Sequence, residues 1–152
     1  MARPGAVPPR LAEVTCVFCA IVEGSVHADV VLDEPDVLGI LDARPVFQGH
    51  VLLLPRAHVP TLLEVSPELL PVLMGAAQRV AAAVVDGLGA QGSFVAMNNV
   101  VSQSVPHLHV HVVPRTKGDG LRGFFWPRTR YADSDEAQAY AARLGAALAP
   151  PA

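Results

Sequence analysis

Strict alternation of histidine and aliphatic residues marks one stretch of the chain. Within residues 106–114, His107, His109 and His111 alternate with leucine and valine. Alternation of period two predicts a strand with the three imidazoles on one face and the aliphatic side chains packed in a core on the other. The row of imidazoles could form a nucleophilic centre, a metal site or a plain polar outer face.

Four other segments have the short apolar runs and flanking turn residues that are typical of strands. Two of them flank an Asp-Glu-Pro-Asp cluster, which predicts a hairpin. The third run is almost continuously apolar, which indicates burial on both of its faces. The four segments are residues 29–32, 37–41, 50–54 and 93–98.

The spacing of apolar residues predicts three helices. Over residues 69–88 they recur every three or four positions, which gives a long helix one buried face, and Ser66 with the proline after it would cap the start. We also expect a short helix over 16–23 and a last helix over 134–148, capped at Ser134 and the two acidic residues that follow it. A long helix set against a mainly antiparallel sheet predicts the α+β class.

With 152 residues, of which 51% are hydrophobic, the chain can form one domain with a substantial core. We expect a flexible tail over 1–13, a domain over 14–131, and a C-terminal helix and tail over 132–152. The apolar runs are shorter than the ~18 to 20 residues of a membrane span, and no secretion signal is recognisable, which predicts a cytoplasmic protein without a membrane partner. A net charge of -3 gives no general attraction to nucleic acid.

The two cysteines form a Cys-x-x-Cys pair, Cys16 and Cys19. In a reducing compartment such a pair is a redox couple or half of a zinc site. A redox couple would need a strand directly before the first cysteine, where this chain has two prolines and room for only a short strand. A zinc site would need two further ligands from elsewhere in the chain.

The histidine row and several other motifs together resemble the histidine triad (HIT) family of nucleotide hydrolases and transferases, in its bacterial zinc-binding form. The matching motifs are His-Leu-His-Val-His-Val-Val, Cys-Val-Phe-Cys-Ala-Ile-Val-Glu-Gly, residues 42–45 with 49–58, and Ser-Gln-Ser-Val at 102–105. The resemblance covers about residues 16–128. It implies a five-stranded, mainly antiparallel sheet with one long and one short N-terminal helix, and a homodimer whose sheets join into ten strands.

The resemblance also implies cleavage at the alpha-phosphate of a purine nucleotide, such as a diadenosine polyphosphate or a nucleoside phosphoramidate. His109 would be the nucleophile, because a neutral imidazole nitrogen can attack phosphorus and leave a nucleotidyl-histidine that water hydrolyses. Its other ring nitrogen must then keep a proton and donate it, in this family usually to a backbone carbonyl. His111 would donate to phosphate oxygens, with His50 beside it.

Further residues match the family positions that hold the nucleotide. They are Phe18, Ile21 and Leu41 as apolar walls for the base, Asp42 for the ribose hydroxyls, and Asn99, Gln103 and Ser104 for phosphate or leaving-group oxygens. One departure is Ser102, where the family commonly has glycine. A side chain makes a left-handed backbone costly there, which bears on the phosphate contacts of Asn99 and Gln103.

The zinc that the resemblance implies would be held by Cys16, Cys19, His58 and His107. Two thiolates and two imidazoles make a closed tetrahedral set with no open position for water, so the metal would be structural and catalysis would need no cofactor.

Three other functions stay open from the sequence. Inorganic phosphate could replace water as the second acceptor, which would make the protein a phosphorylase. The protein could instead be a nucleotide-binding regulator with incidental turnover, or an interaction domain that depends only on zinc. The last of these leaves His50, His109 and His111 without a role.

Overall fold

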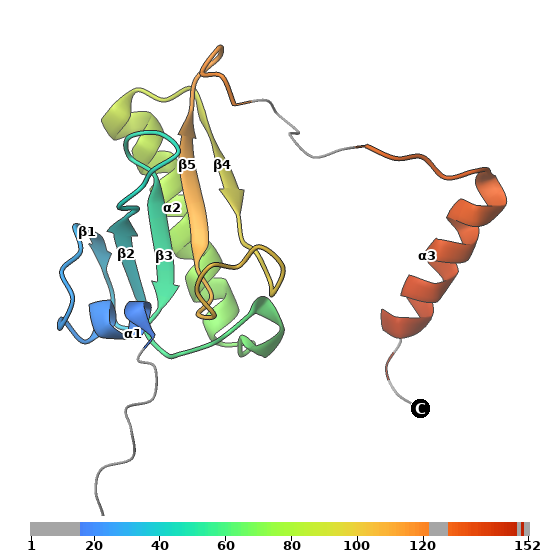
Figure 1. Ribbon diagram of the computed structural model, residues 1–152, viewed down its shortest axis with the longest axis horizontal. Helices are drawn as coiled ribbons and strands as arrows, with labels where there is room; N and C mark the ends of the chain where they lie inside the picture. The colour runs from blue at the N-terminus through green and yellow to red at the C-terminus, as the bar shows by residue number, and fades with distance from the viewer. Residues whose placement is uncertain (1–15, 122–127, 149, 151–152) are drawn as a thin grey trace, which may run out of the picture. The chain divides into compact units, whose positions relative to one another are not determined.

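The computed structural model describes residues 16–121, 128–148 and 150 (Figure 1). The chain divides into two compact units, Met1–Asp119 and Gly120–Ala152. The tail expected over residues 1–13 lies outside the described residues, and the expected domain boundary at residues 131 and 132 stays a prediction.

The larger unit contains a sheet of five strands in which all neighbouring strands are antiparallel. The strands are β1 (Val30–Asp33), β2 (Val37–Leu41), β3 (Val51–Pro55), β4 (Gly92–Ala96) and β5 (Val110–Arg115). Their order across the sheet is β1-β2-β3-β5-β4, so β3 and β5 pair with each other inside the sheet. The α+β class, the five strands and the hairpin of β1 and β2 are thereby confirmed, the first four strands to within two residues.

β5 begins at Val110, later than the histidine alternation suggests, but the alternation of faces already holds in the segment before it. Leu108, Val110 and Val112 are fully buried in the core on one side of the sheet. His107 and His109 instead pack against the ring of Phe18 on the other side. The prediction that the histidines share one face is confirmed.

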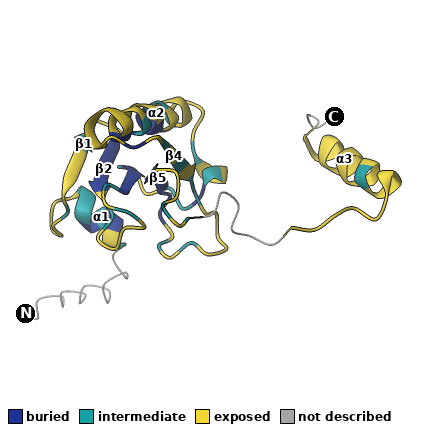
Figure 2. Ribbon diagram, turned by 90° about the horizontal axis from the view of Figure 1, so that it is seen from above, coloured by how far each residue is buried: buried dark blue, intermediate teal, exposed yellow. Residues whose placement is uncertain are grey.

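The long helix α2 (Leu69–Leu88) covers the aliphatic face of the sheet (Figures 1 and 2). The residues of its buried stripe are Leu73, Ala76, Ala77, Val80 and Val84. The hydroxyl of Ser66 accepts a hydrogen bond from the N–H of Leu69 at 3.1 Å, as the predicted cap requires. The helix ends at Gly89, whose φ of 69° is left-handed.

By length and apolar composition α2 could also cross a bilayer, alone among the helices that the structure describes. Its buried side chains, however, form one continuous core with residues of β2, β3 and β5. This is how the core helix of a globular domain packs, and such helices pass the same test of length and composition.

The short helix α1 (Val17–Val22) packs on the opposite face of the sheet (Figure 2). Here a second, smaller core forms from Phe18, Leu38, Ile40, Leu52 and Leu54. Alternate residues of β2 and β3 therefore point to different cores, which explains why the predicted apolar run of β3 is continuous. The histidine row lies on this second face, beside α1.

A single 3-10 turn, η1 (Leu62–Glu64), follows β3 and was not predicted. Thr61 and Glu64 form a reciprocal capping box at its start. The pattern Thr-x-x-Glu in the sequence is the signal that would have identified it.

The smaller unit contains α3 (Ser134–Leu148), which confirms the last predicted helix. Its cap is Asp133 rather than Ser134, since the N–H of Glu136 donates to Asp133 Oδ1 at 2.9 Å. No described residue of α3 is buried.

Candidate active site

His109 stands at the centre of the histidine row with its tautomer fixed. Its Nδ1 lies 2.8 Å from the backbone oxygen of His107, and because a carbonyl can only accept, Nδ1 carries the proton. In the neutral imidazole, the lone pair is then on the Nε2 atom of His109. The ring is only 4% exposed, and the edge of Phe18 packs against it with 5.0 Å between ring centroids. This is the arrangement that a nucleophilic imidazole needs.

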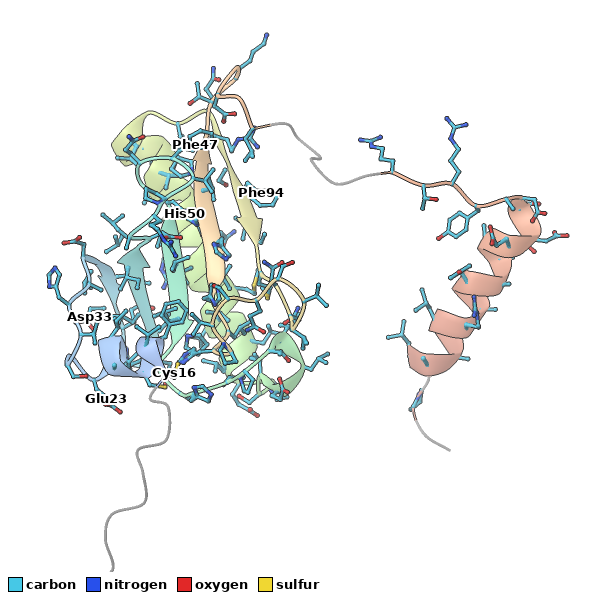
Figure 3. All side chains as sticks on the ribbon, viewed as in Figure 1. Cys16, Glu23, Asp33, Phe47, His50 and Phe94 are labelled. Atoms are coloured by element: carbon cyan, nitrogen blue, oxygen red, sulfur yellow. The ribbon has the colours of Figure 1, made fainter. Side chains whose placement is uncertain are left out.

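His50 enters the same site from the start of β3, where Figure 3 labels it. Its backbone is held in a tight loop: its N–H donates to Phe47 O at 3.0 Å and its carbonyl accepts from Asp42 N at 2.9 Å. The preceding Gly49 has a φ of +89°, and a Cβ there would collide with the side chain of Leu88. Only glycine fits this position, which explains the Gly-His pair in the sequence.

A hydrogen-bonded chain links His50 to His111. The N–H of Val46 donates to His50 Nδ1 at 3.2 Å, so the proton of a neutral His50 is on Nε2. That nitrogen lies 2.9 Å from His111 Nδ1 and donates to it, which leaves the proton of His111 on its own Nε2. Asp42 Oδ2 is 3.6 Å from His50 Nδ1, too far for a hydrogen bond, so we assign the bond to Val46.

The electrostatics of the site keep these two imidazoles neutral. Burial, followed by the nearby rings of His109 and His50, lowers the pKa of His111 to about 4. Burial also lowers the pKa of His50, although Asp42 acts in the opposite direction. Both rings are therefore uncharged at neutral pH, as the chain of hydrogen bonds requires.

A pocket of about 690 Å³ opens over this face of the sheet. Its apolar lining is Val17, Phe18, Ile21, Ala28, Ile40, Leu41, Ala43, Leu52 and Val105, and its polar lining is His27, Asp29, Asp42, Arg44, Ser104, His109 and His111. Pockets of this size and mixed lining are typical small-molecule sites. The pocket brings together most of the residues predicted to hold a nucleotide.

Asn99 and Gln103 are not among the residues that line this pocket. Asn99 Oδ1 accepts from Leu62 N at 2.8 Å, and the amide of Gln103 bonds to Val100 N at 2.9 Å and Pro60 O at 2.7 Å. Asn99 thus fastens the loop before the histidine row to the start of η1, and Gln103 fastens it to Pro60 just before η1. Their predicted contacts with phosphate oxygens stay predictions.

The same loop contains two strained residues. Ser102 has a φ of 60°, the left-handed backbone expected where the family commonly has glycine. Val100 has a φ of 68°, which is rarer still because its branched side chain crowds the backbone. The N–H of Val101 closes a tight turn by donating to Asn99 O at 2.8 Å.

The four predicted zinc ligands converge at the start of α1, where Figure 3 labels Cys16. His107 Nδ1 lies 3.5 Å from Cys16 Sγ and 3.6 Å from Cys19 Sγ, and His58 Nδ1 lies 3.2 Å from Cys19 Sγ. Burial, and then the Cys16 thiol, raise the pKa of Cys19, an effect that a bound cation would reverse by stabilising the thiolate.

The hydrogen bonding of His107 tests whether this set suits a metal. His107 Nε2 lies 2.8 Å from Pro55 O and must donate to it, so the lone pair of Nδ1 faces the two sulfurs. The ligand atoms of all four residues lie within 4.8 Å of one another. Two sulfurs and two imidazole nitrogens this close together fit a tetrahedral zinc ion.

Two partners in this site are backbone groups that sequence reasoning missed, namely the N–H of Val46 and the carbonyl of Pro55. The backbone acceptor that the family resemblance implies for His109 is the carbonyl of His107, which the sequence did not identify as the acceptor. Every residue has such groups, so no residue type signals them. The sequence also assigns no role to His27 and Asp29, two exposed residues that line the pocket, with His27 Nε2 3.6 Å from Asp29 Oδ1.

Comparison with known proteins places this site in a family. The family model described as HIT domain matches residues 23–118. An uncharacterised HIT-like protein of Mycobacterium tuberculosis is 38% identical over 108 residues, which are 70% of this chain and 75% of that protein.

Two further relatives have names that state an activity. An adenylylsulfatase of Arabidopsis thaliana is 32% identical, with 70% of this chain and 55% of that protein aligned. An adenosine 5'-monophosphoramidase of Schizosaccharomyces pombe is 29% identical, with 74% of this chain and 84% of that protein aligned.

Among solved structures, a zinc-bound histidine triad family protein from Mycobacterium smegmatis has a TM-score of 0.68 and 37% sequence identity. The alignment covers 88% of this chain and 97% of that chain.

Proposed function

The chain belongs to the histidine triad (HIT) family, and from this premise we propose that it is an enzyme that cleaves a purine nucleotide at its alpha-phosphate through a nucleotidyl-histidine intermediate. The observation that carries the proposal is the hydrogen bond from His109 Nδ1 to His107 O. It leaves the Nε2 lone pair of a buried imidazole at a pocket large enough for a nucleotide.

In the first step, His109 Nε2 attacks the alpha-phosphorus and the bond to the leaving group breaks. The leaving group departs with the electron pair of that bond and takes a proton from solvent. The proton on His109 Nδ1 stays with the imidazole, and the carbonyl of His107 stabilises the positive charge that develops on the ring.

His111 would stabilise the phosphate during this step. Its Nε2 proton is free to bond a phosphate oxygen, because its Nδ1 already accepts from His50. Removing one well-placed donor of this kind usually slows a reaction by roughly 10² to 10³. In the second step, water attacks the same phosphorus and the P–N bond breaks, with its electron pair returning to His109 Nε2. One proton of the water passes to solvent, and the nucleoside monophosphate and free His109 are released.

The pocket residues would hold the nucleotide so that its alpha-phosphate lies next to His109. Phe18, Ile21 and Leu41 form apolar walls for a base, and Asp42 offers a carboxylate to ribose hydroxyls. Ser104 lines the pocket together with His109 and His111, where a phosphate oxygen would lie. Asn99 and Gln103 would act on phosphate through the loop that they fasten.

The names of two relatives support a nucleotide with an adenosine moiety. The adenylylsulfatase and the adenosine 5'-monophosphoramidase are the relatives with a stated activity among those compared above. We therefore place adenosine phosphoramidates and adenosine 5'-phosphosulfate first among the candidate substrates, with diadenosine polyphosphates as the other class.

A structural zinc would be held by Cys16, Cys19, His58 and His107, and the zinc-bound relative supports this assignment. When bound, zinc would supply a cross-link rather than a reactive centre, because its four protein ligands leave no position for substrate.

We further propose that the protein is a cytoplasmic homodimer. Several apolar residues of α2 are exposed in the single chain, namely Leu70, Val72, Met74, Val85 and Leu88. β4 is an edge strand, whose unpaired backbone groups could pair with a second β4. Together these surfaces would join two sheets into one of ten strands.

The experiment that tests the proposed reaction is product analysis with adenosine phosphoramidate, adenosine 5'-phosphosulfate, diadenosine triphosphate and diadenosine tetraphosphate. Each substrate is incubated with and without inorganic phosphate, and a His109→Asn variant is the control. We expect AMP without added phosphate from the wild type and none from the variant, while both bind AMP.

Other outcomes would identify the alternative functions. ADP that forms only when phosphate is present would make the protein a phosphorylase. If neither protein turns over any of the four substrates although both bind AMP, the enzyme proposal is wrong and a nucleotide-binding regulator is favoured.

A further inference from the structure

His107 takes part in both sites at once. Its ring is fully buried, with Nδ1 facing the two cysteine sulfurs and Nε2 donating to Pro55 O. Its backbone carbonyl is the acceptor that fixes the proton on His109 Nδ1. A rotation or shift of residue 107 that followed loss of a metal would therefore move the hydrogen bond that prepares the nucleophile.

The helix α1 also connects the predicted zinc site to the pocket, through the residues that would form the wall for the nucleotide base. Cys16 and Cys19 bracket Phe18, whose ring packs on His107 and His109 with centroids 5.9 Å and 5.0 Å apart. Ile21 from the next turn lines the same pocket. The cysteines and the base wall thus share one short helix.

This helix has little to hold it in place by itself. It has six residues, and its N-cap, Cys16, makes no side-chain capping hydrogen bond. Isolated helices of this length are unstable in water, so packing and cross-links must fix α1. Its start is held by the packing of Phe18 on the second core and on the rings of His107 and His109, and by the contacts of the two cysteines with the rings of His58 and His107.

From these contacts we propose that His107 is a positioning residue that couples metal occupancy to the nucleotide site. With zinc bound to Cys16, Cys19, His58 and His107, α1 is held as the base wall and the carbonyl of His107 holds His109 in one tautomer. Without zinc, nucleotide affinity and the tautomer of His109 are lost together. The coupling rests on the proposed function, in which His109 is the nucleophile.

The test compares ligand variants at His58, which is exposed and does not line the nucleotide pocket. His58→Ala leaves three zinc ligands, whereas His58→Cys restores four. Four samples are compared. They are the wild type loaded with zinc, the wild type stripped of zinc by a chelator, and each of the two variants after zinc loading. Three quantities are measured: zinc content, the Kd for AMP, and the protonated ring nitrogen of His109 by nitrogen-15 NMR.

We expect the stripped wild type and His58→Ala to bind AMP on the order of 10- to 100-fold more weakly than the loaded wild type. Their His109 signals should show a mixture of tautomers instead of a proton on Nδ1 alone. His58→Cys should recover both the affinity and the single tautomer. If chelation unfolds the core of the wild type, the comparison of His58→Ala with His58→Cys still tests the coupling.

The coupling is wrong if His109 keeps one tautomer and AMP affinity is unchanged when zinc is absent. It is also wrong if zinc-loaded His58→Cys behaves as His58→Ala does, because the histidine ring itself would then be responsible. Failure of the proposed function has a different signature: loaded wild type would turn over no substrate, while the tautomer of His109, which needs no nucleotide to be read, would still respond to zinc.

Discussion

His50 Nε2 lies 2.9 Å from His111 Nδ1, which joins a residue at the start of β3 to the last histidine of the row in β5. The two strands are paired, with Leu52 opposite His111, so their register sets this contact. It means that the position of the proton on His111, which lines the pocket, is set by a residue outside the histidine row.

Replacement of His50 tests this relationship. His50→Ala removes the donor to His111 Nδ1, so the His111 proton is no longer confined to Nε2 and we expect kcat to fall by about 10²-fold. KM should change little, because His50 does not line the nucleotide pocket. Steady-state kinetics would show a lower kcat with a nearly unchanged KM. His50→Gln, whose amide can still donate, should recover part of kcat. Equal losses in the two variants would contradict the assigned tautomer.

The lowered pKa of His111 predicts a pH dependence of stability. The folded protein binds this proton only near pH 4, whereas an unfolded chain binds it near the ordinary value of 6.5. Between these values the unfolded state holds more protons, so the free energy of unfolding falls as pH drops from about 6.5 to about 4. The contribution of His111 is at most roughly 3 kcal/mol, because solvent screens the partly exposed ring. Urea unfolding of wild type and His111→Asn at pH 7 and pH 4.5, at equal zinc content, would show a smaller loss in the variant.

Removal of the metal should lower thermal stability. Zinc would cross-link α1, the segment after β3 and the histidine row through Cys16, Cys19, His58 and His107, and metal binding of this kind contributes directly to folding. We expect a chelator to lower the Tm by about 10 °C, which corresponds to a few kcal/mol in a chain of this size. Scanning calorimetry with and without chelator would measure it. A Cys16→Ser, Cys19→Ser double variant should have a lower Tm than the wild type, and the chelator should not change it. An unchanged Tm of the wild type in the presence of chelator would contradict a bound zinc.

The left-handed backbone of Val100 gives a prediction that is independent of catalysis. Val100 is 72% exposed, so its side chain contributes little packing, while its φ of 68° is unfavourable for a branched residue. Val100→Asn should raise the free energy of unfolding by about 1 kcal/mol, because asparagine tolerates this backbone. The matched control is Val101→Asn: this neighbour is 78% exposed but has no positive φ, and its replacement should change nothing. Equal changes in the free energy of unfolding for Val100→Asn and Val101→Asn, measured by chemical denaturation, would refute backbone strain at Val100.

The parts of the fold that depend on repeated side-chain patterns were predictable from the sequence. The stripe of α2 and the alternation through His107, His109 and His111 follow from helical and strand periodicity alone, and both are confirmed. The sequence does not define strand ends in the same way. β5 begins only at Val110, because backbone pairing depends on the neighbouring strands rather than on the residues themselves.

The site was predictable where side chains identify themselves and not where the backbone acts. Residue types and a family resemblance identified the four cysteine and histidine residues that cluster at the start of α1 and several residues that line the pocket. They could not show that the carbonyls of Pro55 and His107 accept hydrogen bonds from the rings of His107 and His109. Nor could they show that the Gln103 amide bonds to Pro60, 43 positions away in the chain. These partners are set by how loops meet in space, which no local pattern encodes.

The two-sided character of the strand that holds the histidines also constrains how the chain can misfold. A slip of one position would turn His109 and His111 into the hydrocarbon layer under α2 and send Val110 and Val112 out to the pocket. Burying several imidazoles without partners costs several kcal/mol, comparable to the whole stability of a small domain. Misregistered molecules would therefore unfold rather than persist, and a preparation that melts cooperatively should consist of molecules in which His109 and His111 all lie on the pocket side of the sheet.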